Sequence, residues 1–129
     1  MSKLLTIALP TYNRAKLLDK QLLWLANAIK GFELECEILI SDNCSTDDTP
    51  KVVKKWQANF ANVKFVCKRN QENIGAVRNI ASCIQQATSK YVWVISDDDN
   101  ISDSAIADLI EVLQKHSDLA LVILNFSKS

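Results

Sequence analysis

Short apolar runs alternate along the chain with longer segments in which apolar residues recur every three or four positions. The short runs predict five β-strands, which cover residues 4–9, 36–41, 63–67, 91–95 and 119–124. The periodic segments predict four helices, which cover residues 14–30, 49–59, 75–87 and, from a cap at 102 or 103, as far as 113. Strands that are separated by helices favour parallel pairing through right-handed crossovers. We therefore predict an α/β fold, in which a mostly parallel sheet of about five strands carries helices on both faces.

The predicted helices have apolar faces and recognisable ends. The inner face of the first helix comprises Leu18, Leu22, Leu25 and Ile29, and that of the third comprises Val77, Ile80, Ala81 and Ile84. Thr49 followed by Pro50 is typical of a helix start, because proline at the first helical position loses no hydrogen bond. The run at 91–95 is nearly all apolar, so we expect a strand that is buried on both faces.

Length and charge then limit the possible partners. The 15 basic and 15 acidic residues balance to a net charge of zero, and 48% of the 129 residues are hydrophobic. A chain of this length can bury about two thirds of the surface that its unfolded form exposes, so we expect one core. A chain without net charge has no general attraction to nucleic acid or acidic membranes. We therefore predict a single domain over residues 1–129 that has no nucleic-acid partner.

Rare residue types exclude several functional classes. Gly31 and Gly75 are the only glycines, whereas a GxGxxG fingerprint or a Walker loop needs glycines at short spacing. The single histidine, His116, excludes a multi-histidine metal site, and its polar neighbours favour a solvated surface position. The four cysteines form no CxxC pair, so we interpret them as reduced thiols.

No apolar run is long enough to predict a signal peptide or a membrane span. The stretch at residues 1–10 is interrupted by Thr6 and closed by Pro10, and no later run approaches the ~20 residues of a span. We therefore expect no transmembrane segment and a cytoplasmic location, with peripheral membrane association where the chain forms part of a longer protein.

Polar loops follow four of the predicted strands, at residues 10–14, 42–48, 68–75 and 96–100. In parallel sheets, ligands bind outside the carboxyl ends of the strands, where such loops converge. Three consecutive aspartates, Asp97 to Asp99, follow a buried strand, and their mutual repulsion requires a cation or solvent to neutralise it. Carboxylates without histidine suit Mg²⁺ or Mn²⁺ together with a diphosphate ligand. The alternative interpretation is a solvated turn that caps the helix beginning near Ser102.

Candidate groups for binding phosphate and a nucleobase lie in the other loops. Gly75 opens a predicted helix, and the free N–H groups at such a helix end can receive a phosphate. Arg78 can add a charge-assisted contact, or it can be a surface arginine on an amphipathic helix. Asp42 can accept a hydrogen bond from a nucleobase or brace its own turn. Tyr12 can flank a base or face the core.

Four segments carry a resemblance to a known family. They are Pro10-Thr11-Tyr12-Asn13-Arg14, Asp42 to Thr49, Asn73-Ile74-Gly75 with Arg78-Asn79, and Tyr91 to Asp99. Together they resemble the nucleotide-binding half of family 2 glycosyltransferases, which have the Rossmann-like GT-A fold. The four segments come in the family's order, each on the correct side of a predicted strand, and the match covers almost the whole chain.

The resemblance implies a site for a nucleotide-diphospho-sugar donor. It implies nucleotide binding by Pro10, Thr11, Tyr12, Arg14, Asp42, Asn73, Gly75, Arg78, Asp97 and Asp98. It implies that Mn²⁺ or Mg²⁺ is held by Asp99, with Asp97 as the second candidate ligand. The family reaction is sugar transfer with inversion in polysaccharide or glycoconjugate synthesis, to a saccharide or lipid-linked acceptor.

The chain departs from the family pattern at three places. Asn43 and Cys44 stand where members commonly have a second acid and a small residue. Ser96 stands where many members have the first acid of their DxD motif, so we favour Asp99 as the metal ligand. The gap between Asn73 and Arg78 is shorter than in many members.

In this family, the acceptor site and the catalytic base follow the region that is matched here. No carboxylate lies between residue 124 and Ser129, and a general base must reach the proton that it removes. We therefore expect the chain to be truncated before the acceptor region, with its base beyond Ser129, and to be inactive by itself.

Two other classes of protein share an acidic, metal-binding α/β architecture. A receiver-like, Mg²⁺-binding signalling module needs acids after its first strand, where this chain has Pro10-Thr11-Tyr12. A nucleotidyltransferase usually relies on a glycine-rich loop at the same place. The donor-site hypothesis requires Asp42, Gly75 and Asp99 to face one cleft.

Overall fold

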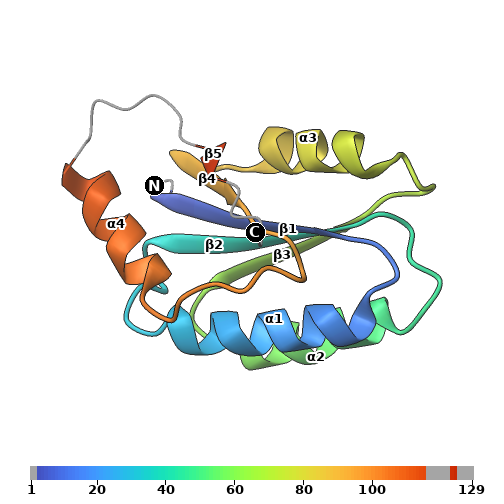
Figure 1. The fold of residues 1–129 in the computed structure, drawn as a ribbon, viewed down its shortest axis with the longest axis horizontal. Coiled ribbons are helices and arrows are strands. Elements are labelled where there is room, and N and C mark those ends of the chain that lie inside the picture. Colours follow the sequence, from blue (N-terminus) through green and yellow to red (C-terminus); the bar gives the residue numbers. More distant parts are fainter. Residues whose placement is uncertain (1–2, 116–122, 125–129) are drawn as a thin grey trace.

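The computed structural model describes residues 3–115 and 123–124, in which strands and helices alternate (Figure 1). The elements are β1 (Leu5–Thr11), α1 (Ala15–Ala28), β2 (Cys36–Asp42), α2 (Thr49–Asn59), β3 (Lys64–Arg69), α3 (Ala76–Gln86), β4 (Tyr91–Val94), α4 (Ala105–Lys115) and β5 (Ile123–Leu124). None of the helices in these described ranges is both long and apolar enough to cross a membrane. His116, which we predicted at the surface, lies outside the described residues.

All strands of the sheet pair in parallel, in the order β3-β2-β1-β4-β5. The central strand is β1, in which Leu5 lies beside Cys36 of β2 and Tyr91 of β4. The predicted α/β class and parallel sheet are therefore confirmed. Four strands contain between four and seven residues, whereas β5 contains only two. Within the described residues, the sheet thus has four full strands and the short β5, and residues 119–122 of the predicted fifth strand lie outside this part of the chain.

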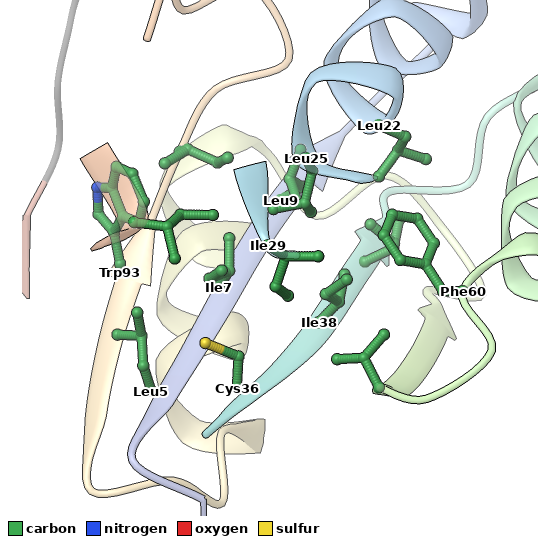
Figure 2. Close-up of a cluster of buried hydrophobic side chains, with 14 of the residues drawn as sticks. Leu5, Ile7, Leu9, Leu22, Leu25, Ile29, Cys36, Ile38, Phe60 and Trp93 are labelled. Carbon is green, nitrogen blue, oxygen red and sulfur yellow. The ribbon is translucent and has the colours of Figure 1, made fainter. Parts of the chain in front are cut away.

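The alternation of side chains along each strand divides the core into two layers. On one face, Leu5, Ile7 and Leu9 of β1 pack with Leu22 and Leu25 of α1 (Figure 2). Helices α1 and α2 lie together on this face, and α4 adds its buried side chains to the same cluster (Figure 1). Burying each such side chain contributes roughly 1.5–3 kcal/mol. Among the described helices, only α3 covers the opposite face, and the helices thus lie on both faces as predicted (Figure 1).

Helix α3 presents polar side chains to the sheet, which changes its predicted orientation. Its buried residues are Asn79, Ser82 and Cys83, whereas Val77 is 80% exposed. The prediction that Val77 lies on the inner face is therefore wrong. Asn79 bonds to Ser41 of β2, and this hydrogen-bonded contact outweighs the apolar period that the sequence displays.

A buried carboxylate lies within the sheet on the face that α3 covers. Glu37 of β2 is 3% exposed, and its Oε1 accepts hydrogen bonds from Thr6 Oγ1 at 2.6 Å and Thr88 N at 3.0 Å. Lys64 Nζ lies 3.2 Å from Oε2. Burial opposes ionisation, but the hydrogen bonds from Thr6 and Thr88 outweigh it and lower the pKa of Glu37. The carboxylate is therefore fully partnered and structural.

The four cysteines are unpaired thiols, as predicted. Burial raises the pKa of Cys36 to about 12 and that of Cys83 to about 11, so both stay protonated at neutral pH. Cys44 is partly buried in the loop after β2 and has a left-handed backbone, with a φ of 68°.

Candidate functional site

The loops after β1, β2, β3 and β4 converge on one cleft at the carboxyl edge of the sheet. Its volume is about 710 Å³, which lies within the usual range for ligand sites. The cleft is lined by Pro10, Thr11, Tyr12, Arg14, Asn43, Asn73, Gly75, Ala76, Asn79, Ile80, Val94, Ile95, Ser96, Asp97, Asp98 and Asp99. All of the predicted site residues except Asp42 and Arg78 are therefore brought together here.

Asp97 is held in place where β1 and β4 end. Its carboxylate is buried and accepts a hydrogen bond from Thr11 Oγ1 at 2.9 Å. Arg14 Nη1 approaches the other oxygen at 3.4 Å. Burial raises the pKa of Asp97, although Thr11 and Arg14 both act in the opposite direction. Thr11 thus serves the site by fixing an aspartate.

Asp98 and Asp99 point in different directions from the same turn. Asp98 is about half exposed, and the hydrogen bond from Ser96 Oγ, followed by the charge of Arg14, lowers its pKa. Asp99 is nearly buried, and its Oδ2 accepts a hydrogen bond from Ser96 N at 2.8 Å. The other oxygen of Asp99 has no hydrogen-bond partner in the described part of the chain, so it is available to a ligand.

Gln21 of α1 holds the turn at residues 96–99, the acidic turn, through its backbone. Its Nε2 donates to the carbonyl oxygens of Ser96 at 2.8 Å and Asp99 at 3.1 Å. We did not predict this residue from the sequence. The available signal was a glutamine between Leu18 and Leu22, on the buried face of an amphipathic helix, where a polar side chain needs a partner.

The acidic turn provides a donor set that fits Mg²⁺ or Mn²⁺. Residues 3–115 contain no group of three histidine, cysteine or acidic side chains that could hold a metal by themselves. Mg²⁺ is commonly held by only one or two carboxylates, and its other ligands are phosphate oxygens and water. Asp99, with Asp97 beside it, meets this requirement, and a diphosphate would supply the remaining oxygens.

A network of asparagines shapes the opposite wall of the cleft. Asn43 Nδ2 donates to Asn73 Oδ1 at 2.8 Å, and Asn43 Oδ1 accepts from Asn70 Nδ2 and from the backbone of Ile74. Asn73 Oδ1 also accepts from Gly75 N at 2.9 Å, just before α3 begins. Of these residues, the sequence predicted only Asn73 and Gly75 as parts of the site.

The loops after β1 and β2 are joined by hydrogen bonds of the residues that follow Asp42. Asn13 N donates to Ser45 Oγ at 2.9 Å, and Asn13 Oδ1 accepts from Thr46 N at 2.7 Å. Asp47 Oδ2 accepts from Ala15 N at the start of α1. The Ser45-Thr46-Asp47 segment therefore positions the loop at residues 10–14, and its members do not line the cleft.

Asp42 does not face the cleft, contrary to our prediction. Its Oδ1 accepts from Ser45 N at 3.0 Å and its Oδ2 from Arg69 Nη1 at 2.9 Å, so it braces its own loop. Asp42 lines a separate cleft of about 350 Å³ beside α2. The cause is the period of two along β2, which directs Asp42 to the same face as Ile40 and directs Asn43 toward α3.

Arg78 also lies outside the cleft. It is exposed on α3, one position away from the inward-facing Asn79. Tyr12, by contrast, lies at the mouth of the cleft and is 41% exposed rather than packed in the core. Gly75 and Asp99 therefore share one cleft, and Asn43 takes the position that we assigned to Asp42.

The structure is a Rossmann-like α/β domain with a cleft at the carboxyl edge of its parallel sheet, which is where such folds commonly bind ligands. The sequence model of Glycosyl transferase family 2 matches residues 6–128. The chain therefore belongs to glycosyltransferase family 2, as the four loop motifs predicted. This membership favours the glycosyltransferase interpretation over the receiver-like and nucleotidyltransferase alternatives.

Two curated relatives illustrate this membership. The abequosyltransferase RfbV of Salmonella typhimurium is 35% identical over 118 residues, which cover 92% of this chain and 35% of that protein. The GalNAc(5)-diNAcBac-PP-undecaprenol beta-1,3-glucosyltransferase of Campylobacter jejuni is 31% identical over 107 residues, which cover 83% of this chain and 33% of that protein. The chain thus spans about a third of the length of these relatives.

Solved structures share the fold. TarS 1–349 of S. aureus in complex with UDP matches with a TM-score of 0.75 and 27% identity, over 88% of this chain and 33% of that chain. The mannosyltransferase PcManGT of Pyrobaculum calidifontis, in complex with GDP-Man and Mn²⁺, matches with a TM-score of 0.72 and 22% identity, over 86% of this chain and 32% of that chain. At this lower identity, the second likeness supports the GT-A fold alone.

Proposed function

We propose that this chain forms the donor-binding part of a glycosyltransferase, and that the 710 Å³ cleft receives a nucleotide-diphospho-sugar together with Mn²⁺ or Mg²⁺. The observation that carries the proposal is the meeting of the acidic turn, Arg14 and the start of α3 around one space. The UDP complex of TarS, which shares this fold, supports a nucleoside diphosphate as the ligand class.

Residues on the two walls have different roles in this proposal. Asp99, with Asp97 beside it, would hold the divalent cation. When bound, the cation would neutralise the diphosphate and stabilise it as a leaving group. Tyr12 presents its ring at the mouth of the cleft, where it can stack on a base.

The opposite wall would bind the phosphates. Gly75 precedes the first turn of α3, whose free N–H groups and dipole favour an anion. Gly75 N itself is already bonded to Asn73, so the free donors are those of the next residues in α3. We assign the asparagine network the role of holding this helix end at the cleft.

We further propose that the chain binds the donor without transferring sugar efficiently by itself. The carboxylates that line the cleft are Asp97, Asp98 and Asp99, and the proposal commits them to the metal and to Arg14. Within the described residues, no other acid lines the cleft to deprotonate an acceptor. We also propose that sugar transfer proceeds with inversion and that the acceptor is a saccharide or is lipid-linked. The catalytic base would lie in another part of a longer protein. A cytoplasmic location stays a prediction.

Calorimetry with nucleoside diphosphates tests the proposal directly. UDP, CDP, GDP and ADP would each be titrated into the protein with Mn²⁺ and again with EDTA. We expect at least one of them to bind with Mn²⁺ and to bind about tenfold or more weakly without it, because the diphosphate and the acidic turn repel each other.

A matched pair of variants locates the effect. Asp99→Asn should abolish the dependence on Mn²⁺, whereas Asp103→Asn, an equal charge change at an exposed position outside the cleft, should preserve it. If no nucleoside diphosphate binds in either condition, the proposed function is wrong.

A further inference from the structure

One arginine forms ion pairs with two of the three aspartates in the cleft. Arg14 precedes the first turn of α1, and its side chain, which is 50% exposed, reaches across to the turn after β4. The same nitrogen, Nη1, lies 3.4 Å from Asp97 Oδ1 and 3.2 Å from Asp98 Oδ2. Among the described residues, no other basic side chain forms an ion pair with this acidic turn.

The contacts of Arg14 with Asp97 and Asp98 are weaker than an optimal arginine–carboxylate pair. A forked pair uses two nitrogens at about 2.7–2.9 Å, whereas here one nitrogen is shared at longer distances. Both side chains of the Arg14–Asp98 pair are about half exposed, and ion pairs that are exposed to solvent contribute only about 0–1 kcal/mol. By contrast, the Thr11 hydrogen bond to Asp97 has ordinary length and does not depend on Arg14. Arg14 can therefore release Asp98 while Thr11 keeps Asp97 in place.

We propose that Arg14 is a resident counter-cation of the cleft that exchanges partners when the ligand binds. In the free protein it neutralises Asp97 and Asp98, and in the loaded protein it releases Asp98 and pairs with the diphosphate. This inference rests on the proposed function. Arg14 would then have two opposing effects. It weakens the binding of a divalent cation alone, because both compete for the same carboxylates, and it strengthens the binding of a diphosphate together with the cation.

Binding of Mn²⁺ alone to Arg14→Gln separates these two effects. We expect about fivefold to tenfold tighter Mn²⁺ binding than in the wild-type protein, because a positive charge in contact with two carboxylates is removed. The same variant should bind the nucleoside diphosphate several-fold more weakly in the presence of Mn²⁺. Water-proton relaxation would measure the first quantity and calorimetry the second.

Two further variants control for net charge and for folding. Lys16→Gln makes the same charge change at an exposed position two residues away and should leave Mn²⁺ binding unchanged. Arg14→Lys keeps a positive charge at the site and should restore most of the wild-type discrimination against free Mn²⁺. Thermal melting of all variants, followed by circular dichroism, would establish that each is folded.

The outcomes for Arg14 and for the proposed function are distinct. Equal or weaker binding of free Mn²⁺ by Arg14→Gln, or no binding by either protein, overturns the role of Arg14. If the wild-type protein binds none of the tested nucleoside diphosphates, the proposed function is wrong instead. Tighter Mn²⁺ binding together with weaker diphosphate binding supports the exchange.

Discussion

Replacing Asn79 with alanine should destabilise the domain by about 2–4 kcal/mol, because it removes the centre of a buried polar network. Asn79 is 2% exposed. Its Oδ1 accepts from Ser41 Oγ at 2.6 Å and Asn70 Nδ2 at 3.0 Å, and its Nδ2 donates to Ser41 O at 3.0 Å.

The magnitude follows from the groups that lose their partner. Each buried polar group that is left unsatisfied costs about 1–3 kcal/mol. Three groups are affected, but the Ser41 hydroxyl can rotate and Asn70 Nδ2 keeps its hydrogen bond to Asn43. The expected loss of about 2–4 kcal/mol is therefore that of one to two unsatisfied groups rather than of three.

Urea unfolding provides the assay. With an m value near ~2 kcal/mol/M, the midpoint should fall by about 1–2 M while m stays constant. Asn27→Ala is the matched control, because this exposed asparagine donates only to Leu23 O within its own helix, and its change should stay within about 0.5 kcal/mol. If Asn79→Ala unfolds at the wild-type midpoint, the network does not hold α3 against the sheet.

Three further predictions concern backbone strain, pH and thiol chemistry. Gly75→Ala and Gly31→Ala should each lose about 1–3 kcal/mol, because both glycines have positive φ, but only Gly75→Ala should also weaken nucleotide binding in calorimetry. Glu37→Gln should be less stable than wild type at pH 7. The lowered pKa of Glu37 means that its contribution is present above its ordinary value of 4.5 and disappears as the pH falls through the folded pKa, so urea midpoints measured from pH 7 to 3 should converge. Iodoacetamide at pH 7.5 should modify Cys44 before the buried Cys36, as mass spectrometry of digests would show.

Three results would contradict these predictions. Equal loss of nucleotide affinity in both glycine variants would mean that binding follows stability alone. A constant difference between Glu37→Gln and wild type at every pH would show that the carboxylate gains nothing from its charge. Early alkylation of Cys36 would contradict its burial.

The sequence was sufficient to predict the alternating elements and the edge of the sheet where the loops meet. Leu18, Leu22 and Leu25 lie on the buried face of α1, as their spacing indicated. Convergence at the carboxyl edge follows from parallel pairing, which short β-runs between helices make almost obligatory. Gly75 and Asp99 consequently share a cleft, although they lie in loops that follow different strands.

The direction of individual side chains was harder to predict, because it depends on register. Asp42 and Asn43, at the end of β2, point to opposite faces, and the motif comparison placed Asp42 in the cleft that Asn43 lines. Asn79, rather than Val77, faces the sheet because polar pairing with Ser41 competes with the hydrophobic period of α3. A strict period of two along β2, counted from Ile38 and Ile40, would have predicted the position of Asn43.

Paramagnetic broadening by Mn²⁺ in the presence of a nucleoside diphosphate tests most directly whether the cleft is the donor site. In two-dimensional amide spectra, we predict that the signals of Asp97, Asp98 and Asp99 disappear first and that those at the start of α3 follow. Signals from Lys51 and Lys54, which line the smaller cleft beside α2, should persist. Broadening centred on Lys51 and Lys54, with the aspartate signals intact, would contradict the account.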